Sequence, residues 1–387
     1  MKKLFRNATM LVAMAAVTVS MASCSDDNDN NTNGDDSQAA VVAEQFVDHT
    51  VAPTYTALAA KAEQLASELA ALKANPNDAG LRQACETFLA AREEWEKSEA
   101  FLFGAAGDYG VDPHIDSWPL DLDAFNTLMN SPAMLEALAG EDGDAVAGDR
   151  LGNALLGFHG IEYILFANGQ PKSASAITEN QWTYVAAVAG DLRNRCYQLE
   201  VGWMGDAAPA SHIAKLDDLE MQYTVAGGDY SYGENMKNAG QAGSTYATRK
   251  AALMAIVQGC IDIADEVGTS KIGAAHTGED PTYIESPYSQ KSIIDFHNNI
   301  VSIQNVYMGG VEGQRNESNS LHHYMHTLNS ALDSEVLEAI DNALAKIDAM
   351  PAPFVNNISA SANGDAMEAC AALSEILDEV VSTIRNN

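Results

Sequence analysis

The sequence predicts an all-α protein in which two similar up-and-down four-helix bundles pack together. Apolar residues recur at three- and four-residue spacing in both halves of the chain, as in the core-facing stripe of a bundle helix. These stripes are clearest at Tyr55, Leu58, Ala62, Leu65, Leu69 and Leu72, and at Cys370, Leu373, Leu377, Val380 and Ile384. No segment shows the strict alternation of a strand, and a Gly-rich stretch from about Asp206 to Gly243 separates four predicted helices from four more.

Eight main helices are expected, near residues 39–74, 77–104, 145–167, 179–204, 244–267, 289–308, 333–349 and 364–385. Pro53 should bend the first helix, and Thr178 with Gln181 forms a capping box for the fourth. Ser289 is a good N-cap for the sixth. The Gly-rich stretch is expected to be a mobile surface excursion. Residues 39–205 would then form the first bundle and residues 206–387 the second.

The first 23 residues have the pattern of an export signal. A positive start is followed by an apolar core that ends at Ala22 and is too short to span a bilayer as a stable helix. The core runs into Met21-Ala22-Ser23-Cys24, which resembles the lipobox of bacterial lipoproteins. Acyl chains on Cys24 would hold the protein on a membrane, because each buried CH2 adds about 0.8 kcal/mol. The alternative is an ordinary secretory signal cleaved near Ala22.

An acidic, Asn-rich run follows Cys24 and predicts a flexible tether over residues 24–38, because it cannot bury apolar surface. A serine at position 25 favours the outer membrane of Gram-negative bacteria. The acidic run resembles the surface-export signal of Bacteroidetes lipoproteins. We therefore expect a cell-envelope, outer-membrane lipoprotein whose body faces either the periplasm or the outside.

The net charge limits the classes of partner that the chain can bind, and the cysteine pattern bears on zinc ligation and disulfides. The formal net charge of −33 repels nucleic acid and anionic lipid, so no nucleic-acid partner is expected. It is compatible with cation binding, although solubility explains it equally well. Beyond Cys24 the chain has Cys85, Cys196, Cys260 and Cys370, far apart and outside any CxxC pattern. Buried thiols are expected rather than zinc ligands, with distant disulfides left open.

His159 and Glu162 are the strongest candidates for a functional pair. They stand in an almost wholly apolar helical segment, 151–166, which predicts burial of both. Three residues apart, they share one helix face. Gly157 and Gly160 leave room there for a neighbouring backbone or a ligand. A buried carboxylate must be paired, metal-bound or protonated, so either a bound cation or a structural hydrogen bond, with Arg92 as a further partner, would compensate Glu162.

Further candidates come from three other segments. Glu99 lies on the same apolar-aromatic face as Trp95, so it is expected to be buried, unlike Glu93, Glu94 and Glu96. The following Pro-bounded loop carries Asp116 and Trp118 and could line a site or cap the bundle. In the second half the candidates are Glu285, Ser286, Ser289, Asp295 and Asn298. The polar stripe Asp295, Asn298, Asn299 and Ser302 predicts contact with a ligand or a protein surface, or a hydrogen-bond network between the bundles.

Together these segments resemble the imelysin-like proteins. The match rests on Gly157-x-His159-x-x-Glu162, which is the GxHxxE motif of that family, and on the segments 95–103, 116–119 and 285–310. The resemblance implies two similar four-helix bundles with a functional site at their interface, and a role in iron uptake with suspected metal or iron binding. It also carries an older zinc metallopeptidase label.

Two hypotheses follow for the same residues. In the first, His159, Glu162 and Glu99 bind a metal ion, iron first and zinc second, or a small iron-containing ligand. Asp116 is a further candidate ligand, and the second bundle would close the site through Glu285, Ser289, Asp295 and Asn298. The partners would be that ligand, the membrane through lipidated Cys24, and an iron-transport system. In the second, the chain is a zinc peptidase using HxxE, with a third ligand from His114, His297 or the later histidines. Binding is favoured because Glu162, spent as a ligand, leaves no evident general base. A third hypothesis is an interaction module whose polar stripes only join the bundles.

A rival metal site lies in the second half. His322 and His326 stand at i,i+4, a spacing that can chelate a transition metal. Glu317 is the nearby carboxylate in the sequence.

Overall fold

The computed structural model describes residues 32–387, and their regular secondary structure is helical apart from one short antiparallel pair, β1 (Phe166–Ala167) and β2 (Gln170–Pro171). The predicted all-α class is confirmed. The predicted signal and lipobox lie outside the described residues. None of the helices in residues 32–387 has the length and apolar content needed to cross a bilayer.

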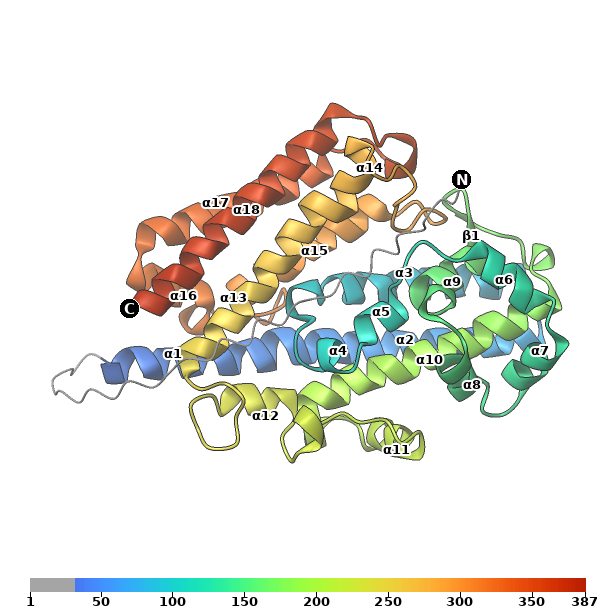
Figure 1. Ribbon diagram of the computed structural model, residues 1–387, viewed down its shortest axis with the longest axis horizontal. Coiled ribbons are helices and arrows are strands. Elements are labelled where there is room, and N and C mark those ends of the chain that lie inside the picture. Colours follow the sequence, from blue (N-terminus) through green and yellow to red (C-terminus); the bar gives the residue numbers. More distant parts are fainter. Residues whose placement is uncertain (1–31) are drawn as a thin grey trace, which may run out of the picture.

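The first half is organised around a long helical rod. α1 (Thr32–Phe46), a π-turn at Val47–Val51 and α2 (Ala52–Ala74) follow one another without a break. α10 (Glu179–Met204) packs along α2 (Figure 1), and α3 (Asp78–Glu96) packs on the same helix. α3, which carries a residue predicted for the site, is therefore packed directly on this rod.

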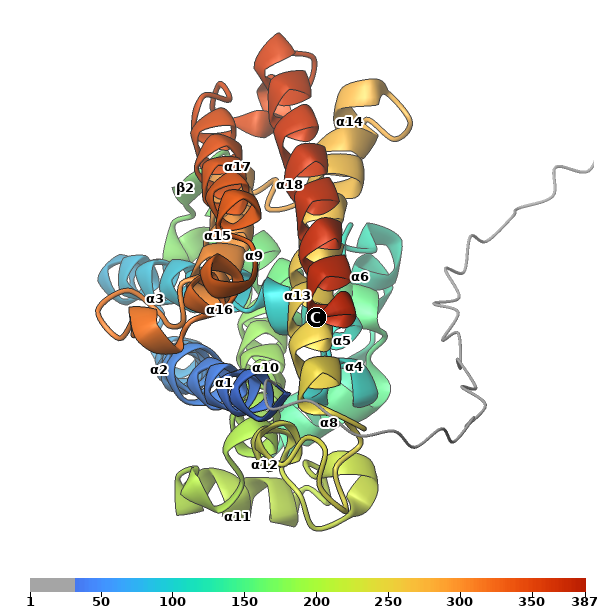
Figure 2. The same cartoon turned by 90° about the vertical axis from the view of Figure 1, so that its left-hand side faces the viewer.

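Four long helices make up the second half: α13 (Arg249–Glu266), α15 (Ser292–Tyr307), α17 (Ser330–Asp348) and α18 (Ser361–Asn386). α18 packs against α13 and α17, and α15 packs against the same two helices. Figure 2 shows this group upright above the rod, which is seen nearly end-on. In the Gly-rich connection, α11 (Ala210–Asp218) and α12 (Tyr232–Lys237) pack against α10. The division into two bundles at residue 206 stays a prediction.

The two halves meet where α3 packs against α15 and where the 3-10 turn Glu99–Phe101 packs against α13 and α15. α9 (Gly157–Leu165) approaches this junction from the first half and contacts α3. The junction places the predicted site segments next to one another.

Several helix boundaries differ from the prediction. The expected helix over 145–167 is interrupted: α8 (Gly143–Arg150) ends before a 3-10 turn at Asn153–Leu155, and α9 begins at Gly157. α3 stops at Glu96, and α1 begins at Thr32, inside the predicted tether. Ser289 is not an N-cap, because α15 begins three residues later with Lys291 in that position.

Other local predictions are confirmed. Thr178 and Gln181 form the capping box of α10. The four cysteines of the described part are all buried and free. The shorter helices are α4 (Ala105–Asp108), α5 (Val111–Ile115), α6 (Leu122–Met129), α7 (Pro132–Ala139), α14 (Gly273–Thr277) and α16 (Leu321–Leu328).

Candidate functional site

The predicted pair on α9 is buried as expected: His159 is 2% exposed and Glu162 is 1% exposed. His159 Nδ1 lies 3.4 Å from Glu162 Oε2. The other carboxylate oxygen, Oε1, accepts hydrogen bonds from the backbone N–H groups of Tyr288 (3.0 Å) and Ser289 (2.6 Å). Two amides from the second half therefore compensate the buried Glu162 carboxylate.

The second ring nitrogen of His159 is also engaged. Nε2 lies 2.9 Å from Asp116 Oδ1, and the Trp118 ring packs 5.6 Å from the imidazole, centroid to centroid. Burial disfavours the charged ring, but the hydrogen bonds to Asp116 and Glu162 outweigh it and raise the pKa of His159 to about 9. His159 is thus held as an imidazolium between two carboxylates at neutral pH.

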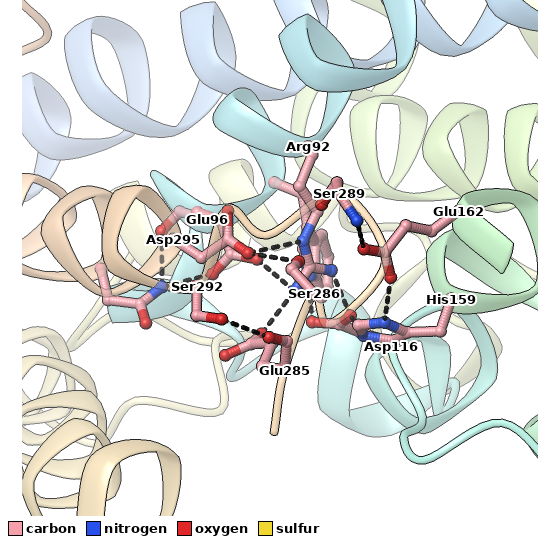
Figure 3. A network of polar contacts seen from close by, with 12 residues as sticks. Arg92, Glu96, Asp116, His159, Glu162, Glu285, Ser286, Ser289, Ser292 and Asp295 are labelled. Carbon is pink, nitrogen blue, oxygen red and sulfur yellow. Dashed lines mark hydrogen bonds and ion pairs between the residues drawn. The ribbon is translucent and has the colours of Figure 1, made fainter. Parts of the chain in front are cut away.

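Arg92, on α3, is the centre of a network of buried ion pairs (Figure 3). Its guanidinium pairs with Asp116 and Glu285, lies 2.5 Å from Glu96, and has Nε 3.8 Å from Asp295 Oδ2. Glu162 is not among the Arg92 ion pairs of the described residues, so the Arg92–Glu162 contact considered from the sequence is not formed.

Lys271 is a second buried cation at the junction. It lies in a π-turn at Val267–Ile272 that continues from α13. Its ammonium is 3.1 Å from Glu285 Oε1 and 3.7 Å from both Glu96 Oε2 and Glu99 Oε1. Burial disfavours the ammonium, yet Glu285 and the neighbouring acids raise the pKa of Lys271 above its ordinary value.

Carboxylates outnumber cations in this cluster. Arg92, Lys271 and protonated His159 face Glu96, Glu99, Asp116, Glu162, Glu285 and Asp295, all buried. Burial raises the pKa of Glu96 and of Asp295 to about 7 and raises that of Glu99 as well. Asp116 behaves in the opposite way: burial opposes its ionisation, but Arg92, His159 and Lys271 together outweigh burial and lower the pKa of Asp116. Some of these carboxyl groups therefore stay protonated near neutral pH, because the cluster has too few cations to balance all of them.

The predicted second-half residues form a rigid wall of this cluster. Ser286 Oγ donates to Asp295 Oδ2 (2.5 Å), and Ser292 Oγ donates to the Glu285 carbonyl (2.6 Å). The Ser289 hydroxyl is buried with no hydrogen-bond partner, and Asn298 is buried on α15. On the opposite wall, Trp95 Nε1 donates to Asp116 Oδ2 (2.7 Å).

The polar stripe of α15 joins the two halves. Asn299 Nδ2 donates to Glu96 Oε2 (2.6 Å), and Ser302 Oγ accepts from the backbone N–H of Ala100 (3.0 Å). This stripe takes part in a hydrogen-bond network between the halves, which is one of the uses considered for it. Glu96 is consequently buried, and the expectation that it points to water is wrong.

A cavity of about 220 Å³ opens beside Asp116. Its lining consists of Glu99, Asp112, Pro113, Asp116, Ser117, Trp118, Glu266, Lys271 and Tyr283. Four of these side chains are acids and one is a cation. The Pro-bounded loop therefore lines a cavity, and the predicted Glu99, Asp116 and Trp118 all contribute to its lining.

Three groups of described residues bring metal-ligating atoms within 4.8 Å of one another: Asp116, His159 and Glu285; Glu96, Glu99 and Asp116; and Glu96, Glu285 and Asp295. Asp116 belongs to two of the groups and Glu162 to none. His114 Nε2 is 2.8 Å from Asp191 and His297 Nδ1 is 2.8 Å from Asp348, and neither histidine belongs to any of these three groups.

Two members of the cluster, Glu96 and Lys271, are not among the residues predicted from the sequence. Glu96 is one of three acids within four residues, which is the usual pattern of a solvated helix face. Lys271 stands alone in a small-residue segment and has no motif around it. A signal for Glu96 existed in the i,i+4 spacing from Arg92, which allows their ion pair on α3.

The all-helical fold, together with the buried GxHxxE pair where its two halves meet, indicates an imelysin-like protein. The chain belongs to the imelysin family, whose family model matches residues 51–380. It is 28% identical over 344 residues to the "Iron-regulated protein A" of Synechococcus elongatus, covering 87% of this chain and 84% of that protein.

Solved structures agree in fold. The crystal structure of an "iron-regulated protein A precursor" from Parabacteroides distasonis is 29% identical, with a TM-score of 0.76, and the match covers 90% of this chain and 95% of that one. An imelysin-like protein from Psychrobacter arcticum matches with a TM-score of 0.62 at 12% identity, over 88% of this chain and 93% of that one. The second likeness concerns the fold alone.

Proposed function

We propose that this imelysin-family protein binds a metal cation, iron in the first place, or a small iron-containing ligand, in the acidic cluster around Asp116. The observation that carries the proposal is the excess of buried carboxylates over buried cations at the junction of the two halves. Carboxylates in a low-dielectric site cannot all ionise without added positive charge. A bound cation would supply that charge and release the protons.

The donor chemistry fits iron. Carboxylate oxygens with one imidazole suit iron, manganese or zinc, and the group of Asp116, His159 and Glu285 offers these atoms. The cavity beside Asp116 gives a route to the cluster for a small cation. The relative from Synechococcus elongatus is named for regulation by iron, and this name supports iron as the first candidate among these metals.

Within this proposal His159 and Glu162 have different roles. His159 is a ligand once it gives up its proton. Glu162 holds His159 and the backbone of Tyr288 and Ser289 in place, because both of its oxygens are engaged by these groups. The sequence-based prediction of Glu162 as a direct ligand requires these contacts to open. Coordination by Asp116 likewise requires one of its bonds from Arg92, His159 or Trp95 to open.

Calorimetric titration with Fe²⁺ under anaerobic conditions, and with Mn²⁺, tests the proposal. Glu99→Gln removes one cavity carboxylate with little change of shape and should weaken binding by about tenfold or more. Glu93→Gln changes an exposed acid on the neighbouring α3 helix and should bind as the wild type does. No binding by the wild type, or equal binding by all three proteins, contradicts the proposal.

We further propose a cell-envelope setting: a lipoprotein held at the outer membrane through Cys24, which passes its ligand to an iron-transport system. The lipobox-like Met21–Cys24 motif and the acidic run after it support this setting. Labelling of cells with a fatty-acid probe should modify the wild type and not Cys24→Ala. Equal labelling of both proteins would rule out the anchor.

The zinc-peptidase alternative is less well supported by the geometry. The His159–Glu162 pair is enclosed by protein groups on both sides. The active site of a peptidase, in contrast, must be open enough to admit an extended peptide. Incubation with an unfolded protein, with and without chelator, decides between the two. Chelator-sensitive cleavage that is lost in Glu162→Gln would establish the peptidase and displace the binding proposal.

A further inference from the structure

Lys271 is a buried cation that also lines the cavity beside Asp116. Its ammonium donates one hydrogen bond among the described residues, to Glu285 Oε1 at 3.1 Å. The Glu96 and Glu99 carboxylates lie 3.7 Å from the ammonium, which is too far for a direct hydrogen bond. Lys271 is therefore surrounded by carboxylates but bonded closely to only one of them.

The carboxylates around Lys271 are also candidate metal ligands. Glu96, Glu99 and Glu285 each belong to at least one of the three groups whose ligating atoms lie within 4.8 Å of one another. A metal ion bonded to the nearest oxygen of any of them, at about 2.0–2.2 Å, would lie within about 6 Å of the ammonium. Two buried positive charges at such a separation repel each other strongly. The ammonium and a metal ion therefore compete for the same carboxylates.

The cavity gives the ammonium a place to move. It has a volume of about 220 Å³, and its lining includes Lys271, Asp112, Glu266 and Trp118. The Trp118 ring centroid is 5.3 Å from Lys271 Nζ, which is within the range of a cation–π contact. A lysine side chain is a flexible four-carbon stem that carries a point charge. The ammonium can therefore turn away from Glu285 and toward the two cavity acids.

Arg92 is not suited to the same movement. Its guanidinium pairs with Asp116, Glu96 and Glu285 at once, and a planar fork holds its carboxylates in a fixed geometry. Arg92 is not among the described residues that line the cavity. Of these two buried cations, Lys271 is the one that has both looser contacts and adjacent space.

We propose that Lys271 is a displaceable counter-ion: its ammonium occupies the acidic cluster in the metal-free protein, and a divalent metal ion drives it into the cavity toward Asp112 and Glu266. This inference rests on the proposed metal function and adds the regulation of that site. A monovalent ion brings no more charge than the ammonium that it would displace, so the exchange favours divalent ions. Competition with Lys271 also lowers the affinity for the metal, which makes the bound ion easier to release.

Titration calorimetry with Mn²⁺ at pH 8 tests the inference on the wild type and Lys271→Met, which removes the charge and keeps most of the side-chain length. Lys271→Met should bind Mn²⁺ about tenfold more tightly or better. Lys346→Met is the matched control, because it makes the same change of net charge on α17 at a side chain that is 42% exposed. It should bind as the wild type does.

The outcomes separate this inference from the metal function itself. Wild-type binding that Lys271→Met does not tighten beyond the Lys346→Met control would overturn the role of Lys271 and leave the metal function standing. Absence of binding by all three proteins would overturn both.

A measurement on the unaltered chain guards against effects of the substitution on folding. Lys271 is the one buried lysine among the described residues, so ¹⁵N NMR should find its ammonium protons in slow exchange with water in the metal-free protein. Zn²⁺, a diamagnetic ion that suits the same donors, should accelerate this exchange by moving the ammonium into the cavity. Exchange as slow in zinc-saturated protein as in metal-free protein would overturn the proposal.

Discussion

Arg92 is placed so that its one guanidinium contacts four carboxylates from three segments of the chain. Asp116 comes from the loop after α5, Glu285 and Asp295 come from the second half, and Glu96 lies on α3 itself. Breaking a buried ion pair from one side leaves an unpaired charge in a low-dielectric region, which costs far more than the net value of the pair. Arg92 is therefore a structural counter-ion for the site.

Arg92→Met, which keeps the length of the side chain and removes its charge, should lower the free energy of unfolding by about 3–5 kcal/mol. Arg82→Met changes an exposed arginine on the same helix and should stay within about 0.5 kcal/mol of the wild type. Urea unfolding followed by circular dichroism measures both. Similar midpoints for the two variants would contradict the role given to Arg92.

The raised pKa values predict a pH dependence for the metal-free protein. Burial raises the pKa of Glu96 and Asp295 to about 7, above the ordinary values of these acids. The stability that they contribute is complete below those ordinary values and is lost as pH rises through about 7. The pKa of His159 is raised to about 9, so its contribution to stability changes with pH in the same direction and is lost as pH rises through about 9. The pKa of Asp116 is lowered, so its contribution to stability changes in the opposite direction: it is lost as pH falls, and only in the acid range.

The melting temperature of chelator-treated protein should consequently fall between pH 6 and pH 9. Replacing Glu96 with Gln should flatten part of this fall, because an amide does not ionise. Differential scanning calorimetry over this pH range makes the test. A melting temperature that is constant or rises would show that the cluster carries no excess of buried acid.

At this scale the sequence predicts some features and not others. Burial of His159 and Glu162 follows from the apolar segment around them, and their proximity follows from the helical repeat. The acceptor role of Glu162 toward Tyr288 and Ser289 could not be predicted, because backbone amides more than a hundred residues away have no signature in the sequence. Lys271 was missed for the same reason, since its partners come from α3, the 3-10 turn after it and the 285–292 loop.

α9 is the element that fixes the position of the pair. It begins at Gly157, whose φ of +65° suits glycine, and a Cβ there would lie 1.8 Å from the carbonyl oxygen of Ile115. At Gly160 a Cβ would lie 2.4 Å from Tyr184 OH. The space left by these two glycines is thus filled by protein groups.

Gly157→Ala should destabilise the protein by about 2 kcal/mol or more, through both backbone strain and the collision with Ile115. Gly152→Ala is the matched control, because φ is −75° there and no atom lies within 4 Å of an added Cβ. Thermal unfolding compares the two. Equal melting temperatures would mean that the start of α9 is more adaptable than its contacts imply.

Element prediction was accurate for the long helices and poor for the short ones. The apolar repeat places α2, α10 and α18 well because many residues contribute to each stripe. The expected helix over 145–167 failed at the Leu151–Leu156 loop, which is itself apolar and so continues the helical pattern. α5, α6 and α7 are too short for a repeat to be recognised, and tertiary contacts determine them.

At the scale of the whole molecule, the site depends on the approach of the two halves. Glu162 connects α9 to the loop before α15 through the amides of Tyr288 and Ser289. The Gly169 N–H, in the turn between β1 and β2, adds a hydrogen bond to the Tyr288 carbonyl at 2.9 Å. These bonds hold the loop against the first half.

Glu162→Ala should release this loop. The amides of Tyr288 and Ser289 lose their acceptor, so their hydrogen exchange should accelerate while exchange in α18, far from the site, stays unchanged. Hydrogen–deuterium exchange with peptide mass spectrometry covers both segments. Unchanged exchange in the 285–292 loop would show that the loop is held by other contacts.

If the acid-rich cluster between the halves takes up a cation, crystals grown with Fe²⁺ or Mn²⁺ near pH 8 should contain the metal there, which anomalous scattering can detect. We expect an anomalous peak within coordination distance of an Asp116 carboxylate oxygen, with Glu99, Glu96 or His159 as a further ligand. Metal-loaded crystals with no peak at Asp116 would show that the cluster is not a cation site.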